Sequence, residues 1–211
     1  PENPGYGSGA NAGVAALPTH CSRVIICNPD IIWQRESIAE LDKALNDNPT
    51  VGVAGPKTLK DDGSTYPSAR AFPGIRIGIG HALFGELWKS NPWTTQYLGE
   101  YGGSAPRIVD WVSGACLMVN RVSFEAIDGF DSGYFMFFED VDLCFRLKKN
   151  QWRSLYVPHA VITHSGAHST GPKMAEMVKV HHHSAERFLF KLYAGPQYWL
   201  LRQLLRAGLA M

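Results

Sequence analysis

The sequence has 211 residues, of which 45% are hydrophobic and 18% are charged, and its formal net charge is +1. These proportions indicate one globular domain with a sizeable core and exclude an intrinsically disordered chain. The near-neutral charge gives no reason to expect a nucleic-acid partner, which would require a basic surface.

The first half of the chain predicts strands and helices in alternation. Residues 3–17 are glycine-rich and are expected to form a loop that leads into a helix. A β-branched run at 23–27 predicts a buried strand that ends at the turn residues Asn28-Pro29. Helical spacing follows at 36–45, and a short apolar run at 51–55 predicts a second buried strand.

Regular patterning weakens between residues 57 and 103, where Gly, Pro and aromatic residues recur. A long aromatic loop region inside a compact domain favours a functional role. The pattern then predicts a strand at 109–119, a helical turn at 124–127, a helix at 140–149, short strands at 154–157 and 160–163, and an amphipathic helix at 174–193. Strands that alternate with helices indicate an α/β domain with a largely parallel sheet.

The cysteines and the hydropathy pattern indicate the cellular compartment in which the protein is expected. Four cysteines lack the spacing of a zinc site or a redox pair, and three of them lie in apolar runs: Cys21, Cys27, Cys116 and Cys144. We interpret them as buried free thiols in a reducing compartment. The sequence shows no signal-peptide pattern and no apolar run long enough to span a bilayer. These features predict a cytoplasmic location or the cytoplasmic side of a membrane.

Asp30 comes directly after a predicted buried strand, in the sequence Asn28-Pro29-Asp30. In α/β sheets the carboxyl ends of strands are where ligands bind. A carboxylate placed there can hold Mg²⁺ or Mn²⁺ against a diphosphate. The same three residue types also favour a simple turn, and taken alone the turn is the better explanation.

Three carboxylates within four positions, Glu139, Asp140 and Asp142, follow an aromatic run and open a predicted helix. Acidic residues at a helix start are ordinary capping and dipole partners, which accounts for one of them. The preceding residues 134–138 are mostly aromatic, and an apolar wall raises the basicity of a carboxylate by desolvation. A general base needs that property, so we favour a catalytic role.

Histidine and tryptophan side chains supply further candidates. His164 and His168 lie among Ser, Gly and Thr after a short strand, which is typical of a ligand loop with an imidazole metal ligand. The run 181–183 lies inside a predicted helix, so its three rings point in different directions and we interpret it as structural. Trp111, followed by 113–114 as Ser-Gly, is a core residue or a platform for a sugar ring.

In this order the motifs resemble the family 2 glycosyltransferases with a GT-A fold. The match runs from Asn3 to about Tyr193, and its motifs are specific as a set although each is weak alone. They are Asn-Pro-Gly-Tyr-Gly followed by Asn11, Asn-Pro-Asp at 28–30, Trp-Val-Ser-Gly at 111–114, Gly-Phe-Asp at 129–131, Glu-Asp-Val-Asp at 139–142, and His164. The resemblance implies a Rossmann-like GT-A domain at 1–193, followed by an amphipathic helix at 194–211.

The resemblance also implies residue roles. Asp30 and His164 would bind Mn²⁺ or Mg²⁺, and Asp140, with Glu139 beside it, would deprotonate the acceptor hydroxyl. The residues expected near the nucleotide-sugar donor are Asn11, Gly7, Asn28, Asp30 and Arg70. Those expected near the acceptor are Trp111, Ser113, Gly114 and Asp142. Arg70 and Arg146 are further expected to pair with phosphate or carboxylate groups.

Segments 62–70, 91–95 and 167–171 narrow the resemblance to actinobacterial rhamnosyltransferases of cell-wall synthesis. It implies inverting transfer of L-rhamnose from dTDP-rhamnose to the 3-hydroxyl of GlcNAc on polyprenyl diphosphate, in arabinogalactan linker synthesis at the inner face of the plasma membrane. Two alternatives stay open. One is another family 2 enzyme, such as a UDP-galactofuranose transferase, and the other is a non-catalytic remnant that binds carbohydrate or a partner.

The two ends of the chain carry further expectations. Family members begin with a strand–helix–strand segment that recognises base and ribose, and no such segment precedes residue 3. Because the sequence opens with Pro1, we expect a processed or truncated chain whose front, about 60 residues by the size of such units, is lost or supplied by another chain. The leucine-rich, arginine-containing helix at 198–209 either packs on its own domain or lies on the membrane as a peripheral anchor. A homo-oligomer is compatible with the sequence.

Overall fold

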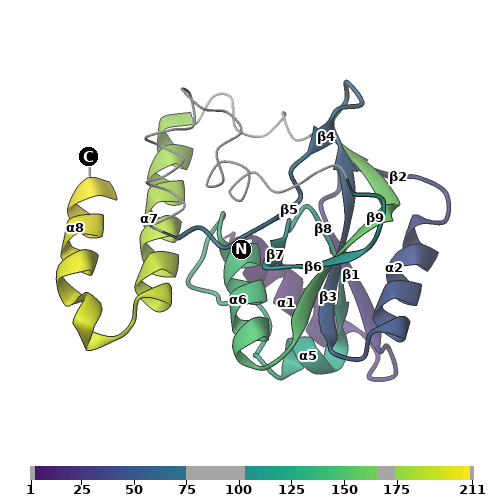
Figure 1. The fold of residues 1–211 in the computed structure, drawn as a ribbon, viewed down its shortest axis with the longest axis horizontal. Helices are drawn as coiled ribbons and strands as arrows, with labels where there is room; N and C mark the ends of the chain where they lie inside the picture. The colour runs from purple at the N-terminus through teal and green to yellow at the C-terminus, as the bar shows by residue number, and fades with distance from the viewer. Residues whose placement is uncertain (1–2, 75–102, 166–173, 210–211) are drawn as a thin grey trace.

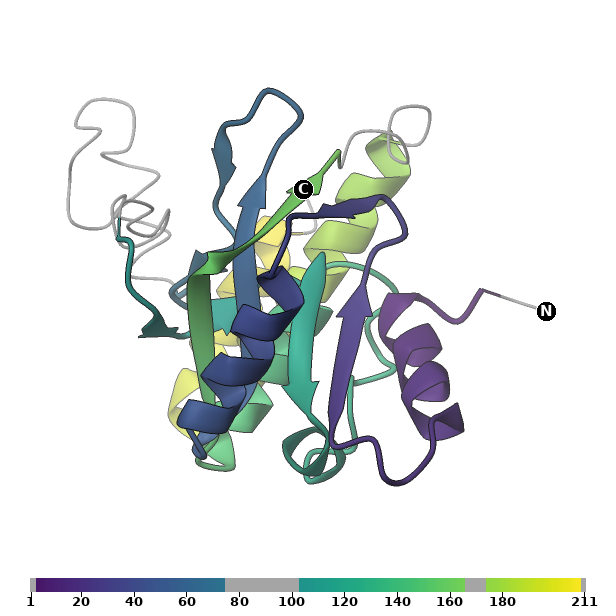
Figure 2. The same cartoon turned by 90° about the vertical axis from the view of Figure 1, so that its right-hand side faces the viewer.

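The computed structural model describes residues 3–74, 103–165 and 174–209, which form a central sheet with helices on both faces (Figures 1 and 2). The α/β class predicted from the sequence is confirmed. The helices are α1 (Tyr6–Ala16), α2 (Ser37–Asp47), α5 (Arg121–Glu125), α6 (Glu139–Lys149), α7 (Met174–Leu192), the 3-10 turn η2 (Pro196–Tyr198) and α8 (Trp199–Leu209). The strands are β1 (Arg23–Cys27), β2 (Ile31–Trp33), β3 (Val51–Leu59), β4 (Thr65–Tyr66), β5 (Ala69–Arg70), β6 (Arg107–Val109), β7 (Trp111–Val112), β8 (Cys116–Asn120) and β9 (Arg153–His164). The motifs at 91–95 and 167–171, which include His168, lie outside the described residues.

The main sheet is mixed, with strand order β1-β8-β3-β9-β2. β3 and β9 pair in parallel, whereas β8 runs antiparallel to both β1 and β3. β1, β3 and β9 therefore point the same way, and their carboxyl ends meet at one edge of the sheet, where β8 begins. The prediction of a largely parallel sheet is wrong, because the alternation of strands and helices does not reveal a strand that returns between two others.

Two predicted strand patterns are resolved differently. The run predicted at 109–119 forms β6, β7 and β8, which are interrupted at Asp110 and again at 113–115. The two strands predicted at 154–157 and 160–163 are one strand, β9, whose register against β3 shifts between Val157 and Val161. Such an irregularity bends the strand without ending it, and Pro158 lies within it.

The glycine-rich segment is a loop that leads into a helix, as predicted, and the loop is short because α1 already begins at Tyr6. Gly7 is buried in this helix against Phe130. A Cβ atom at position 7 would lie 2.8 Å from the Cβ of Phe130, so only glycine permits this close approach. Gly7 therefore serves helix packing, whereas Gly5, with a φ angle of 89°, belongs to the loop before the helix.

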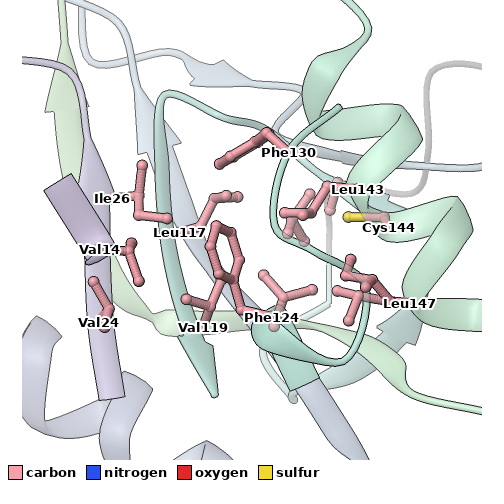
Figure 3. Close-up of a cluster of buried hydrophobic side chains, with 14 of the residues drawn as sticks. Val14, Val24, Ile26, Leu117, Val119, Phe124, Phe130, Leu143, Cys144 and Leu147 are labelled. Carbon is pink, nitrogen blue, oxygen red and sulfur yellow. The ribbon is translucent and has the colours of Figure 1, made fainter. Parts of the chain in front are cut away.

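Two hydrophobic clusters hold the layers together. On one face of the sheet α1, α5 and α6 pack against β1, β3 and β8, and Figure 3 shows this cluster between Val14 of α1 and Leu147 of α6. On the other face α2 packs against β3 and β9 through Leu41 and Leu45. The four cysteines are free, but only Cys116 and Cys144 are buried, and Cys27 is exposed at the end of β1. The prediction of buried thiols therefore holds for two of them.

α7 and α8 form an antiparallel pair on the side of the molecule away from α2 (Figure 1). Arg202 joins the two helices, because its Nη1 donates to the carbonyl oxygens of Tyr193 and Gly195 at 2.7 and 3.0 Å. Arg206 pairs with Glu186 of α7 at 2.7 Å. No helix in the described part of the chain has both the length and the apolar character needed to cross a membrane.

Candidate active site

The edge where β1 and β9 end and β8 begins carries most of the predicted site. Asn28 follows β1, and its N–H donates to the carbonyl of Ala115, just before β8, at 2.9 Å. A cavity of roughly 410 Å³ opens there. Its wall includes Tyr6, Asn28, Tyr66, Arg70, Trp111, Ser113, Gly114, Phe137, Phe138, Glu139, Asp140, His164 and His181.

The predicted metal ligands meet beside this cavity, where His164 is part of the wall and Asp30 contacts it. Nε2 of His164 lies 3.3 Å from Oδ1 of Asp30 and 3.0 Å from Nδ2 of Asn28. Strand pairing causes this approach, because Ile31, the residue after Asp30, lies opposite His164 in the β2–β9 ladder.

An Asp oxygen and a His nitrogen suit a divalent cation that takes its remaining ligands from water and a diphosphate, as Mg²⁺ and Mn²⁺ sites usually do. Among the described residues no cluster of three or more His, Cys, Asp or Glu side chains suits a metal ion. The Asp30–His164 pair therefore fits a cation shared with a bound phosphate group, rather than a closed protein site.

Asp140, which also lines the cavity, is fixed by two backbone hydrogen bonds. The N–H of Gly114 donates to Oδ2 at 2.7 Å, and the N–H of Val141 donates to Oδ1 at 2.8 Å. A Cβ atom on Gly114 would lie 3.2 Å from the Cβ of Asp140, so the glycine permits this contact. Burial raises the pKa of the Asp140 carboxyl, while the two N–H donors and the charge of Arg70 act in the opposite direction.

Glu139 is the second carboxylate on the cavity wall. It is buried, and among the described residues its Oε2 has no hydrogen-bond partner. Burial, followed by the charge of Asp140, raises the pKa of Glu139 to about 7. Two adjacent carboxylates, one of which prefers to keep a proton near neutral pH, have the protonation behaviour expected of an acid–base site.

The loop that delivers this acidic pair is strained. Phe137 and Phe138 have φ angles of 66° and 63°, in the left-handed region that bulky residues rarely adopt. Such conformations cost about 1–3 kcal/mol each and cluster at functional sites. α7 holds the loop in place, since the ring of His181 packs edgewise on both rings, with centroids 5.4 and 5.3 Å away, and Ser184 Oγ donates to the carbonyl of Met136 at 2.8 Å.

Tyr6 is a site residue that sequence reasoning missed. Its hydroxyl donates to the carbonyl of Gly114 at 2.7 Å, next to the N–H that holds Asp140. Burial, with the nearby Glu139 and Asp140, raises the pKa of Tyr6 well above its usual value, so the hydroxyl stays a donor. The one sequence signal for this role was the presence of an aromatic residue within the glycine-rich motif at 3–7. His181, which we interpreted as structural, also lines the cavity.

An aromatic wall faces the acidic pair. Trp111 and Arg70 are directly opposite each other in the β5–β7 ladder. The guanidinium carbon of Arg70 lies 5.5 Å from the Trp111 ring centre and 5.7 Å from that of Tyr66. Ser113 also reaches the cavity, although its N–H is used in a hydrogen bond to the carbonyl of Ser68 at 2.8 Å.

Four predicted ligand-contacting residues are not on the cavity wall: Asp30, which contacts His164 of the wall, and Asn11, Gly7 and Asp142. Asn11 and Gly7 both face Phe130, and the Asn11 amide bonds the Phe130 N–H and carbonyl at 2.9 and 2.8 Å. Asp142 is fully buried on another side of α6, where Lys191 and Arg146 occupy its carboxylate. The structure thus corrects the donor contacts of Asn11 and Gly7 and the acceptor contact of Asp142, which are packing and ion-pair residues. It places Arg146 in the expected carboxylate pairing, at 2.6 Å.

We expect Glu139→Gln to stabilise the fold at high pH. The folded-state pKa of about 7 exceeds the usual 4.5, so ionising Glu139 destabilises the folded protein as pH rises from 4.5 through 7. Removing that titration should add about 2–3 kcal/mol at pH 8 and little at pH 4. Thermal unfolding at both pH values tests this, with Glu176→Gln on α7 as the control for losing one exposed carboxylate. Equal shifts in Tm at pH 4 and pH 8 would contradict it.

Comparison with known proteins agrees with this geometry. A family model described as "Glycosyltransferase like family 2" matches residues 9–182. The chain is 43% identical to an N-acetylglucosaminyl-diphospho-decaprenol L-rhamnosyltransferase of Mycobacterium tuberculosis, over 99% of this chain and 71% of that protein. It is 27% identical to rhamnosyltransferase WbbL of Escherichia coli K12, over 88% of this chain and 70% of that protein.

Among solved structures, GalNAc-T7 in complex with UDP, GalNAc and Mn²⁺ is similar in fold, with a TM-score of 0.52 and 12% sequence identity. The match covers 83% of this chain and 35% of that longer one. At this identity the likeness shows the GT-A fold alone. The family match, the sequence relatives and the fold agree: the chain belongs to glycosyltransferase family 2 and is a glycosyltransferase with a GT-A fold.

Proposed function

We propose that this enzyme transfers L-rhamnose from dTDP-rhamnose to the 3-hydroxyl of GlcNAc on polyprenyl diphosphate, with inversion at the anomeric carbon, in synthesis of the arabinogalactan linker. The observation that carries the proposal is the 43% identity, over 99% of the chain, to the mycobacterial decaprenol-linked L-rhamnosyltransferase. The cavity supports it, because His164 and the acidic pair line the same space, and Asp30 lies 3.3 Å from His164.

Asp140 is the proposed general base. Its two backbone hydrogen bonds hold the carboxylate in one orientation and favour its charged form. In the reaction Asp140 accepts the proton of the acceptor hydroxyl while that oxygen attacks the anomeric carbon. The bond from that carbon to the diphosphate oxygen breaks, and the nucleoside diphosphate leaves with the electron pair. Attack from the side opposite to the leaving group inverts the configuration.

Asp30 and His164 are the residues that would hold Mn²⁺ or Mg²⁺. When bound, the cation would stabilise the negative charge that develops on the departing diphosphate. Asn28, whose amide contacts His164, would fix the imidazole beside the phosphate. Trp111 offers a ring face on which the acceptor sugar can stack.

A donor and acceptor panel tests the function. The full chain is assayed with dTDP-rhamnose and with UDP-galactofuranose, on GlcNAc-diphospho-polyprenol, with Mn²⁺ or with EDTA. We expect metal-dependent product from dTDP-rhamnose alone. NMR analysis of the product should show that rhamnose is attached at the 3-hydroxyl of GlcNAc. Transfer from the UDP sugar instead would establish the competing enzyme. Donor and acceptor binding without any transfer would favour a non-catalytic binding module.

We further propose that the catalytic domain is 1–193 and that the C-terminal helix binds the cytoplasmic face of the membrane that carries the acceptor. α8 leaves Trp199, Leu200 and Leu204 exposed by 60%, 63% and 63%, whereas its Arg202 contacts the end of α7. Tryptophan and leucine side chains on one helix face are typical of interfacial helices.

Replacing Leu200 and Leu204 together with Ser should therefore weaken flotation with anionic liposomes by about tenfold or more, since each loses well over 1 kcal/mol of apolar transfer energy. Circular dichroism and the Tm should change little, because both side chains are exposed in the chain alone. Val122, which is 65% exposed on α5, provides the control variant Val122→Ser. Unchanged flotation of the double variant would rule out this membrane contact.

A further inference from the structure

Arg70 is held in a fixed orientation on the cavity wall. Its Nε donates to the carbonyl of Pro67 at 2.8 Å, and its guanidinium lies against the rings of Tyr66 and Trp111. The Trp111 ring is itself fixed, since its Nε1 donates to the carbonyl of Ala71 at 2.9 Å. An arginine stacked on aromatic rings loses little further side-chain entropy when it binds a ligand.

The two Nη groups of Arg70 remain available to a ligand. In residues 3–74, 103–165 and 174–209 no acceptor bonds either of them, and Arg70 is the one Arg or Lys among the described residues of the cavity wall. A guanidinium fork of this kind matches the oxygens of a phosphate group in a bidentate contact. The carboxylates Glu139 and Asp140, which also line the cavity, would repel an anion elsewhere in it, and this favours binding at the guanidinium.

The position of Arg70 decides between the two substrates that carry phosphate. In the proposed reaction the donor diphosphate lies at Asp30 and His164, and the base Asp140 must lie on the opposite side of the anomeric carbon. Arg70 stacks on Trp111, and the segment that follows Trp111 reaches the base, because the N–H of Gly114 donates to the Asp140 carboxylate at 2.7 Å. A phosphate on the side of the base belongs to the acceptor, because the donor diphosphate leaves from the other side.

We propose that Arg70, held between Tyr66 and Trp111, binds the diphosphate of the lipid-linked acceptor. With the acceptor sugar on Trp111, its reacting hydroxyl lies toward Asp140 and its anomeric phosphate lies one sugar ring away, toward the Arg70 fork. This inference rests on the proposed function and replaces the sequence-based expectation that Arg70 contacts the donor. It makes Arg70 a specificity residue that selects diphosphate-linked acceptors over free or alkyl-linked GlcNAc.

The first test compares two acceptors with the same short prenyl tail, one GlcNAc-diphosphate and one GlcNAc glycoside without phosphate. Arg70→Gln should lower kcat/KM for the diphosphate acceptor by about 10- to 100-fold, the usual loss for a charge-assisted hydrogen bond. It should lower kcat/KM for the phosphate-free acceptor by about twofold or less, and leave the donor KM unchanged. Arg70→Lys should restore only part of the loss, because a point charge replaces a bidentate fork.

Arg107→Gln is the matched control, because Arg107 stacks on Tyr156 at 4.5 Å and lies outside the cavity wall. Its acceptor selectivity should equal that of the wild type. Equal losses for both acceptors in Arg70→Gln would show a packing role only, and a raised donor KM would place Arg70 at the donor. Either result would overturn the proposal.

A binding measurement separates this inference from the proposed function. Calorimetry with GlcNAc 1-phosphate in EDTA removes any metal contribution and requires no turnover. We expect the wild type to bind it at least about tenfold more tightly than GlcNAc, and Arg70→Gln to lose that preference. If the wild type shows the preference but transfers no rhamnose, the proposed function fails and the phosphate site stands. If the wild type shows no preference, the phosphate site is refuted whichever sugar is transferred.

Discussion

Asp140→Asn is expected to lower kcat by about 10²- to 10⁴-fold, the contribution of a positioned general base. The amide cannot take up the proton of the acceptor hydroxyl, whereas the ligands proposed for the donor diphosphate, Asp30 and His164, are unchanged. The donor dissociation constant should therefore stay within about twofold of the wild type. Initial rates with saturating donor and acceptor, together with donor titration by calorimetry, measure both quantities.

The same variant also has a structural cost that must be measured separately. The Asp140 carboxylate accepts N–H groups from Gly114 and Val141 on its two oxygens, but an Asn side chain has one acceptor oxygen. One N–H then faces the amide NH₂, which should destabilise the fold by about 1–2 kcal/mol. Asp128→Asn is the control, because Asp128 is exposed and already in the left-handed region that Asn tolerates. Undiminished turnover in Asp140→Asn would refute the base assignment.

Local sequence pattern predicts where the candidate carboxylates lie, because each comes at the end of a strand or at the start of a helix. Asp30 follows a β-branched run, and Glu139-Asp140 opens a helix after an aromatic run, so local pattern alone places each at an element terminus. That His164 would meet Asp30 followed only from the family resemblance. Its physical cause, the antiparallel pairing of Ile31 with His164, is a long-range contact that no local pattern encodes.

The errors have the same origin. Asn11 and Gly7 belong to a motif that the resemblance placed at the donor, but which side of α1 faces Phe130 depends on how the helix docks. Asp142 sits two residues after Asp140 on one helix, and a rotation of about 100° per residue turns it away from the cavity. Tyr6 was missed because its value lies in a hydrogen bond to Gly114, which is 108 residues away.

The buried Asp142 leads to the largest expected effect on stability. Its carboxylate is fully buried and accepts Lys191 Nζ at 2.5 Å, Arg146 Nε at 2.6 Å and Tyr134 Oη at 3.3 Å. Lys191 also contacts Asp131 at 2.5 Å, so this one ammonium group ties α7 both to α6 and to the loop before it. Although burial acts to raise it, hydrogen bonds led by that from Lys191 hold the pKa of Asp131 well below its usual value.

Lys191→Met should therefore lower the free energy of unfolding by about 2–4 kcal/mol. This is somewhat less than the cost of leaving a buried carboxylate with no cationic partner, because Arg146 still pairs with Asp142. Urea unfolding followed by tryptophan fluorescence measures it, and Lys179→Met, an exposed position on the same helix, is the control. A loss below about 0.5 kcal/mol, the usual range for surface substitutions, would show that α7 is not held through Lys191.

The effect should extend from stability to catalysis. His181 of α7 packs against the rings of Phe137 and Phe138, and the left-handed backbone of these two residues directly precedes the acidic pair. With Lys191 removed, that strained loop can relax, and the Asp140 carboxylate loses the fixed geometry on which proton transfer depends. Without urea, and at a temperature where Lys191→Met is fully folded, we expect kcat to fall by about tenfold while the donor KM is unchanged. Asp30 and His164 are brought together by the pairing of β2 with β9. A loss confined to kcat would therefore place the function of this ion-pair network at the base rather than at the donor.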